Sequence, residues 1–399
     1  MRTRTEKATR RQTREHNRRL VLRHIFDAQD GISRADVARL TRLTKATVSD
    51  LVAELMRDGL VEEAGIGEAS SAGGKPPLLL RVVDGAREVF AVDVSGDQFR
   101  AAALDLRGRV LREQVADAED LTGEAALARL DALLDALYAE RQAPVVGIGI
   151  SSPGLVDTEN GIVCRAVNLQ WQDVPLRERL QTRFGVPVYV ANDSHLTALA
   201  EYTFGMGSPD ANVVVVKVGP GIGSGLVLNG QLFYGDGFSA GEIGHLVVAD
   251  DGVLCSCGNR GCLETVASTR ALFANVRHWL TVHPDSPAAT LLTPPLSCAR
   301  IADALAVDAR LGDVVDEAAH WLGRALAAVV GVLNVRYVRL TGPVRVFGDR
   351  FIDAVQAALH RSVLPELAAQ CEVAFGALGD EAPLLGASAY VLSRELGLR

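Results

Sequence analysis

Hydrophobic positions in the first eighty residues recur at helical spacing and are interrupted by turn signals. The pattern predicts helices over 17–29, 34–40 and 45–57, followed by strands over 60–63 and 75–80. Ser33 and Thr44 stand directly before the second and third helices, where a hydroxyl can accept from the first backbone N–H groups, and Gly59 ends the third. The stretch 65–74 is rich in Gly, Ser and Ala. Three helices and a hairpin in this order predict a winged helix-turn-helix.

Beyond this region the pattern changes to strands that alternate with amphipathic helices. The predicted strands cover 89–94, 99–105, 110–115, 145–150, 186–191, 212–218, 338–341 and 372–377. The predicted helices cover 124–140, 176–184, 194–204, 270–280, 300–306, 313–333, 350–359 and 382–396. This order predicts an α/β fold of two lobes with a cleft between them, and the four prolines of 283–297 indicate a surface loop. We therefore expect a winged helix-turn-helix domain with a basic tail over 1–83 and a two-lobed domain over 84–399.

Composition is that of an ordinary globular chain, with 48% hydrophobic and 23% charged residues. No apolar run reaches the ~18 residues of a membrane span. No apolar stretch follows the basic N-terminus, as one would in a secretory signal. We expect a cytoplasmic protein without a membrane partner.

The net charge of −8 hides an asymmetry along the chain. Residues 1–83 hold 16 Lys and Arg against 11 Asp and Glu, whereas the remainder holds 25 against 38. A basic head on an acidic body favours a polyanionic partner for the head, and double-stranded DNA is the natural one. On charge alone, a solvated tail without a partner remains the alternative.

Three of the six cysteines fall within eight residues, at Cys255, Cys257 and Cys262, shortly after His245. Three thiolates and one imidazole are a favoured tetrahedral donor set for a structural Zn²⁺, and such a site would order the loop 245–262. Three incidental cysteines are the alternative, while the Cys-x-Cys spacing does not match the redox motif Cys-x-x-Cys.

The residues 241–245, Gly-Glu-Ile-Gly-His, followed by Cys-x-Cys-Gly-x-x-Gly-Cys-Leu-Glu over 255–264, resemble the signature of the ROK family of repressors, open reading frames and sugar kinases. The likeness extends over most of the chain, and the head resembles the regulator branch that responds to xylose or N-acetylglucosamine. This resemblance implies an actin/hexokinase-like fold of two lobes. It also implies a sugar-responsive, DNA-binding transcriptional regulator, most simply a repressor of carbohydrate genes.

The resemblance further implies a sugar site between the lobes. The matching positions are Gly154, Asn168, Asn192, Asp193, Glu242, His245 and Glu264. Carboxylates and amides suit this task because they bond vicinal hydroxyls in pairs. A plain helix cap is the alternative for Asn192-Asp193, since both precede a predicted helix.

The glycine-rich turns that hold ATP in the family's kinases depart from their pattern here. The first reads Asp93-Val94-Ser95-Gly96-Asp97-Gln98 in place of Asp-x-Gly-Gly-Thr-Lys, so a carboxylate stands where phosphate would lie. One like-charge pair at ~4 Å costs about 4 kcal/mol at an effective dielectric of ~20. In the second turn, 219–223, and the third, 342–343, Pro220 and Pro343 remove N–H donors. We predict that the chain is not an enzyme; the alternative is an active sugar kinase with Asp193 as its general base.

In a helix-turn-helix the second helix enters the major groove. The predicted DNA contacts are Arg34, Thr44, Lys45, Ala46, Thr47, Ser49, Asp50 and Lys75. The basic tail 2–19 is expected to run along the phosphate backbone. Symmetric operators pair with symmetric proteins, so we expect a homodimer or a homotetramer. A protein-interaction module is the alternative for the head.

Overall fold

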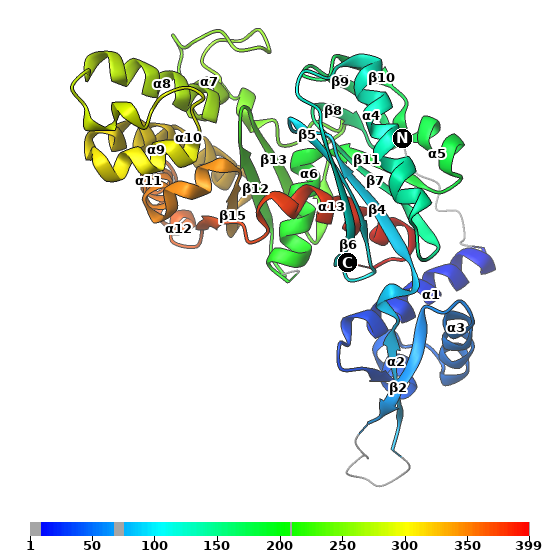
Figure 1. Ribbon diagram of the computed structural model, residues 1–399. Helices are drawn as coiled ribbons and strands as arrows, with labels where there is room; N and C mark the ends of the chain where they lie inside the picture. The colour runs from blue at the N-terminus through cyan, green and yellow to red at the C-terminus, as the bar shows by residue number, and fades with distance from the viewer. Residues whose placement is uncertain (1–8, 68–75, 208–209, 399) are drawn as a thin grey trace.

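The structure, a computed structural model, describes residues 9–67, 76–207 and 210–398. It consists of a small head and two larger lobes (Figure 1). The predicted α/β fold of a winged helix-turn-helix followed by two lobes is confirmed. Within the described residues, no helix is long and apolar enough to cross a membrane.

The head contains helices α1 (Arg10–Asp27), α2 (Arg34–Thr41) and α3 (Lys45–Arg57) and a sheet of β1 (Ile32–Ser33), β3 (Leu78–Val82) and β2 (Val61–Ile66), in that order. Ser33 caps α2 by accepting from Asp36 N (3.2 Å), and Thr44 caps α3 by accepting from Thr47 N (3.2 Å). These caps fix the tight turn between the two helices.

The predicted start of the first helix at residue 17 is wrong, because α1 begins at Arg10. A capping box explains the earlier start, since the Thr9 hydroxyl accepts from Gln12 N and the Gln12 side chain accepts from Thr9 N. Arg14 then pairs with Glu54 of α3, and Arg18 pairs with Asp58, the residue that directly follows α3. Half of the predicted basic tail is therefore a helix packed on the head.

The first lobe is built on a five-stranded sheet in the order β11-β7-β4-β5-β6. Its strands are β4 (Glu88–Asp93), β5 (Gln98–Leu104), β6 (Val110–Asp117), β7 (Val145–Ser152) and β11 (Val188–Asn192). Helices α4 (Gly123–Ala139) and α5 (Leu176–Phe184) cover one face, and α13 (Ala382–Glu395) covers the other. A small sheet of β8 (Leu155–Asp157), β9 (Ile162–Ala166) and β10 (Trp171–Val174), which the sequence pattern did not predict, extends from β7.

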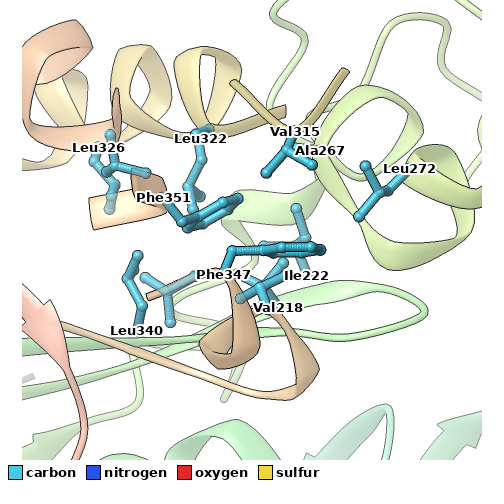
Figure 2. Packing of buried hydrophobic residues seen from close by; sticks show 14 of the residues in the cluster. Val218, Ile222, Ala267, Leu272, Val315, Leu322, Leu326, Leu340, Phe347 and Phe351 are labelled. Carbon is cyan, nitrogen blue, oxygen red and sulfur yellow. The ribbon is translucent and has the colours of Figure 1, made fainter. Parts of the chain in front are cut away.

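The second lobe is built on a sheet in the order β14-β13-β12-β15-β16. Its strands are β12 (Val213–Val218), β13 (Ile222–Leu228), β14 (Gln231–Phe233), β15 (Tyr337–Thr341) and β16 (Glu372–Phe375). Its helices are α7 (Glu264–Ala267), α8 (Thr269–Val282), α9 (Cys298–Val307), α10 (Gly312–Leu333), α11 (Gly348–His360) and α12 (Pro365–Ala368). Figure 2 shows how Phe347 and Phe351 join the sheet to α10 in one core.

Helix α6 (Asp193–Ala200) lies between the two sheets and packs on α13 as well as on β12 and β13 (Figure 1). It continues as a π-helical turn, Glu201–Gly205. The predicted surface loop at 283–297 is only partly a loop, because the short 3-10 helix Pro287–Thr290 places Ala288 and Leu292 in the core of the second lobe.

Candidate functional site

The start of α6 joins three of the residues implied to bind sugar. Asn192 is the N-cap, and its Oδ1 accepts from Ser194 N (2.9 Å) and His195 N (3.3 Å). Its Nδ2 donates to the carbonyl of Gly154 (2.8 Å). Gly154 has φ +80°, and a Cβ there would lie 2.1 Å from the Arg165 carbonyl oxygen, so only glycine fits. The amide of Asn192 thus caps α6, as the helix-cap alternative expected, and joins it to Gly154. Asp193 is the first residue of α6, which lies between the sheets.

The remaining acidic candidates face Asp193 from the second lobe. His245 lies between Glu242 and Glu264, with Nε2 3.9 Å from Glu242 Oε2 and Nδ1 3.9 Å from Glu264 Oε1. Burial raises the pKa of Glu242, and the Asp193 and Glu264 carboxylates raise it further, against the opposing effect of His245. Glu242 and Glu264 therefore flank His245, and Asp193 lies near enough for its charge to act on Glu242.

Asn168 is not joined to this group. It lies exposed in the turn between β9 and β10, and in the described part of the chain no hydrogen bond links it to the other candidates.

The histidine and cysteine cluster meets the geometric demand of a metal site. Ligand atoms of His245, Cys255, Cys257 and Cys262 all lie within 4.8 Å of one another. Cys255 Sγ is 3.5 Å from His245 Nδ1, and the Cys257 and Cys262 sulfurs are 3.6 Å apart. Gly261, at φ +71°, is needed for this closure because a Cβ there would lie 1.6 Å from the Ala249 carbonyl oxygen. These four side chains can bind a metal ion. Nδ1 of His245 lies toward Cys255, and Nε2 lies toward Glu242.

The second glycine turn has few donors left for a phosphate. Gly219 N already donates to the Gly221 carbonyl (2.9 Å), and Pro220 has no N–H. Gly221 itself lies beside Glu264, since a Cβ there would be 3.2 Å from Glu264 Oε2. In the first turn, Asp97 is exposed on the stretch between β4 and β5. The second turn therefore offers few backbone donors, and the first carries an exposed carboxylate.

Lys217 lies beside Asp193 of the candidate sugar site, and no motif predicted it. Its Nζ lies 2.6 Å from Asp193 Oδ2 and 3.3 Å from Ser95 Oγ. A signal was visible in the sequence, because one lysine interrupts the run of valines in β12. A lysine in a strand buried on both faces requires a partner.

The predicted DNA-contacting residues gather at the start of α3. Lys45, Ala46, Ser49 and Asp50 are exposed, whereas the hydroxyls of Thr44 and Thr47 lie 2.9 Å apart. Asp50 lies near Arg14 of α1, where its charge contributes to the raised pKa of that guanidinium, after the larger effect of Glu54.

The two other predicted DNA contacts are Arg34 and Lys75. Arg34 donates to Glu63 Oε1 of β2 (3.0 Å), and Lys75 lies outside the described residues.

Comparison with known proteins covers both parts of the chain. The ROK family model matches residues 89–394. The xylose repressor of Caldicellulosiruptor bescii is 32% identical over 94% of this chain and 95% of its own length. A glucokinase of Halalkalibacterium halodurans is also 32% identical, over 77% of this chain and 96% of its own length. A solved structure of a ROK family transcriptional regulator, described as a homolog of Escherichia coli Mlc, matches with a TM-score of 0.85 and 27% identity over 96% of each chain.

The repressor and the regulator structure thus extend over the head, whereas the glucokinase matches a shorter part of the chain. With a family model covering far more than half of its residues, this protein belongs to the ROK family.

Proposed function

We propose that this protein is a sugar-responsive transcriptional regulator, acting as a repressor of genes for carbohydrate uptake or catabolism. One observation carries the proposal. A helix-turn-helix head is joined to a cluster of carboxylates suited to hydroxyl recognition, beside glycine turns that lack the donors a nucleotide needs. The relatives that extend over nearly the whole chain, head included, are named as repressors or regulators.

The head would bind its operator through α3. Lys45, Ala46, Thr47 and Ser49 occupy the first two turns of this helix, the end that reads base edges in a helix-turn-helix. The exposed residues among them are free to meet phosphate or base groups, while Thr44 orients the helix start. Asp50 and Arg34 would shape this surface rather than add positive charge, because each lies beside an oppositely charged residue.

The effector would be a neutral sugar. Asp193, Glu242 and Glu264 converge with His245, and Lys217 is the cation that Asp193 already engages. Excess negative charge favours uncharged hydroxyl donors and disfavours a phosphorylated sugar. Gly154 and Asn192 would hold the corner of the site, and Asn168 would have to approach from its exposed turn.

A structural Zn²⁺ would be held by His245, Cys255, Cys257 and Cys262. The donor set is one that zinc favours, and four protein ligands leave no open position for catalysis. By fixing Nδ1 of His245, the metal would hold Nε2 toward the sugar and keep Glu264, which directly follows the loop, in place.

The chain would not act as an enzyme. Phosphoryl transfer depends on positioning and charge neutralisation, whereas Asp97 places a carboxylate in the first phosphate turn and Pro220 removes a donor from the second. An active sugar kinase is the second candidate, favoured by the glucokinase relative and by Asp193 in the position of a general base.

Operator binding tests the first candidate. Fluorescence anisotropy with DNA from upstream of the protein's own gene and of neighbouring sugar-uptake genes should show a specific complex that one member of a sugar panel weakens. Asp193→Asn should bind the same DNA but lose the response to sugar. Absence of any specific complex would refute the proposal.

A coupled assay of ADP release over the same sugar panel tests the second. Sugar-dependent turnover by the wild type that Asp193→Asn abolishes would make the chain a kinase. As a DNA-binding regulator it would act in the cytoplasm, as a homodimer or homotetramer on a symmetric operator.

A further inference from the structure

The position of Lys217 follows from the alternation of side chains along β12. Val214, Val216 and Val218 point into the core of the second lobe, where Val218 is seen in Figure 2. Val213 and Val215 lie on the opposite face, against Ala198 and Tyr202 of the α6 segment. Because side chains alternate with a period of two, Lys217 falls on the face that α6 covers.

On that face the ammonium meets groups from the first lobe. Lys217 Nζ lies 2.6 Å from Asp193 Oδ2, at the start of α6, and 3.3 Å from Ser95 Oγ, just after β4. The side chain of Asp193 is 13% exposed and that of Lys217 is 29% exposed, so the pair is largely shielded but still reached from outside. The pair is therefore a bond between two lobes at the edge of the candidate sugar site.

Lys217 is held in its charged form. Burial lowers the pKa of Lys217, but the Asp193 and Asp93 carboxylates outweigh burial and raise it. Asp93 also accepts from Ser95 N (3.1 Å), which ties the serine into the same network. A charged amine buried here without a carboxylate partner would be costly in free energy.

The pairing also orients Asp193. The ion pair uses Oδ2, and among the described residues no hydrogen bond involves Oδ1. One carboxylate oxygen is thus fixed by the second lobe, and the other is available to accept from a ligand hydroxyl. The positive charge beside the first glycine-rich turn, 93–98, is therefore the ammonium of Lys217.

We propose that Lys217 is a positioning residue for sugar recognition, an interlobe latch that holds Asp193 oriented toward the effector and joins the lobes while it does so. The proposal rests on the sugar site proposed above. It assigns to this lysine a role in affinity for the sugar, although Lys217 need not touch the sugar.

A set of four proteins separates this role from simple stabilisation. Wild type, Lys217→Met, Asp193→Asn and the double variant are titrated by calorimetry with the sugar that the panel identifies. Lys217→Met should weaken binding at least tenfold, and the double variant should bind about as weakly as Asp193→Asn, because both changes remove the same oriented carboxylate. Lys217→Arg, which keeps the charge, should remain within about threefold of wild type. A Lys217→Met protein that binds sugar as wild type does would overturn the proposal.

Thermal unfolding of the same proteins without sugar tests the latch independently. Lys217→Met leaves the Asp193 carboxylate without its cation and should lower the melting temperature, whereas adding Asp193→Asn should recover part of the loss. Arg350→Met, which breaks an exposed pair with Asp316 elsewhere in the second lobe, is the matched control and should leave sugar affinity unchanged.

The two experiments fail in different ways. If wild type binds no sugar of the panel, the proposed function fails while the unfolding cycle still decides whether the latch exists. Additive melting shifts for Lys217→Met and Asp193→Asn would refute the latch whether or not sugar binds.

Discussion

The buried carboxylate of Glu201 allows a stability change to be worked out from its contacts. Glu201 is 1% exposed and begins the π-helical turn after α6. Its oxygens accept from Ala377 N (2.8 Å) and Leu378 N (3.1 Å), in the connection that leads from β16 back to α13. Gly205 and Gly376 make room, since a Cβ at either would lie 2.3 Å from a Glu201 oxygen. One side chain thus joins the end of α6 to the connection between β16 and α13.

Glu201→Gln keeps the shape but turns one acceptor into an NH₂ group that faces a backbone N–H. The bond to the remaining oxygen loses its charge assistance, which costs about 1 kcal/mol. The other bond is lost and leaves a buried N–H without a partner, which costs about 1–3 kcal/mol more. We expect a total near 3 kcal/mol and, for cooperative unfolding of a chain of this size, a melting temperature lower by roughly 4 °C.

Scanning calorimetry of the ligand-free protein measures this effect. Glu62→Gln is the control, because Glu62 and its partner Arg81 (3.0 Å) are both about half exposed, so loss of this pair should cost less than about 1 kcal/mol. Sugar affinity should also fall in Glu201→Gln, since α6 carries Asp193 at its other end. Equal melting temperatures for the two variants would refute the assignment of Glu201 as a buried anchor.

Three more outcomes test the metal cluster, an acid-sensitive turn and the head. Elemental analysis should find stoichiometric Zn²⁺ in wild type and in Cys164→Ser, which lies outside the cluster, but not in Cys262→Ser. Hydrogen bonds from Arg310 and Ser286 lower the pKa of Asp308, so its stabilisation is present above the unfolded pKa of about 3.9 and is lost as pH falls through the folded value. Asp308→Asn should accordingly lose less stability than wild type on acidification below about pH 4, as followed by fluorescence. Lys45→Ala should weaken operator binding and reduce the slope of log K against log salt by about one; an unchanged slope would mean that Lys45 contacts no phosphate.

Elements with their own end signals were predictable from the sequence. Helices α3 and α5 have the predicted bounds, because Thr44 caps the first and Gly185 ends the second in a left-handed conformation. The start of α1 was not predicted correctly. Arg14 and Arg18 are held by Glu54 and Asp58, forty residues away along the chain, and no local pattern reveals such partners.

Glycines in β13 show a second limit of sequence reasoning. Gly223 is the last residue of the second nucleotide turn, yet it lies with Gly225 in a strand against α6. A Cβ at Gly223 would lie 2.4 Å from Ser194 Oγ, and one at Gly225 would lie 2.5 Å from Ala198 Cβ. Close helix packing alone requires these glycines, so the motif could not reveal whether the turn still binds nucleotide. The lysine that occupies the site was visible as an anomaly, but its partner Asp193 became apparent only in the fold.

The contact between head and first lobe limits how a sugar signal can reach DNA. Val391, Leu392 and Leu398 share one core with the head helices. Arg107, in the turn after β5, donates to the Phe26 carbonyl (2.7 Å), and its guanidinium lies 3.9 Å from the centroid of the Phe26 ring. Head and first lobe therefore share one core, while the head also borders the second lobe across a pocket of about 750 Å³ whose lining includes Phe26, Asn212 and Asn229. In the proposed response sugar changes the spacing of two heads on the operator, and this route requires a second chain. A protein that stays monomeric on DNA and still releases it on addition of sugar would contradict this route.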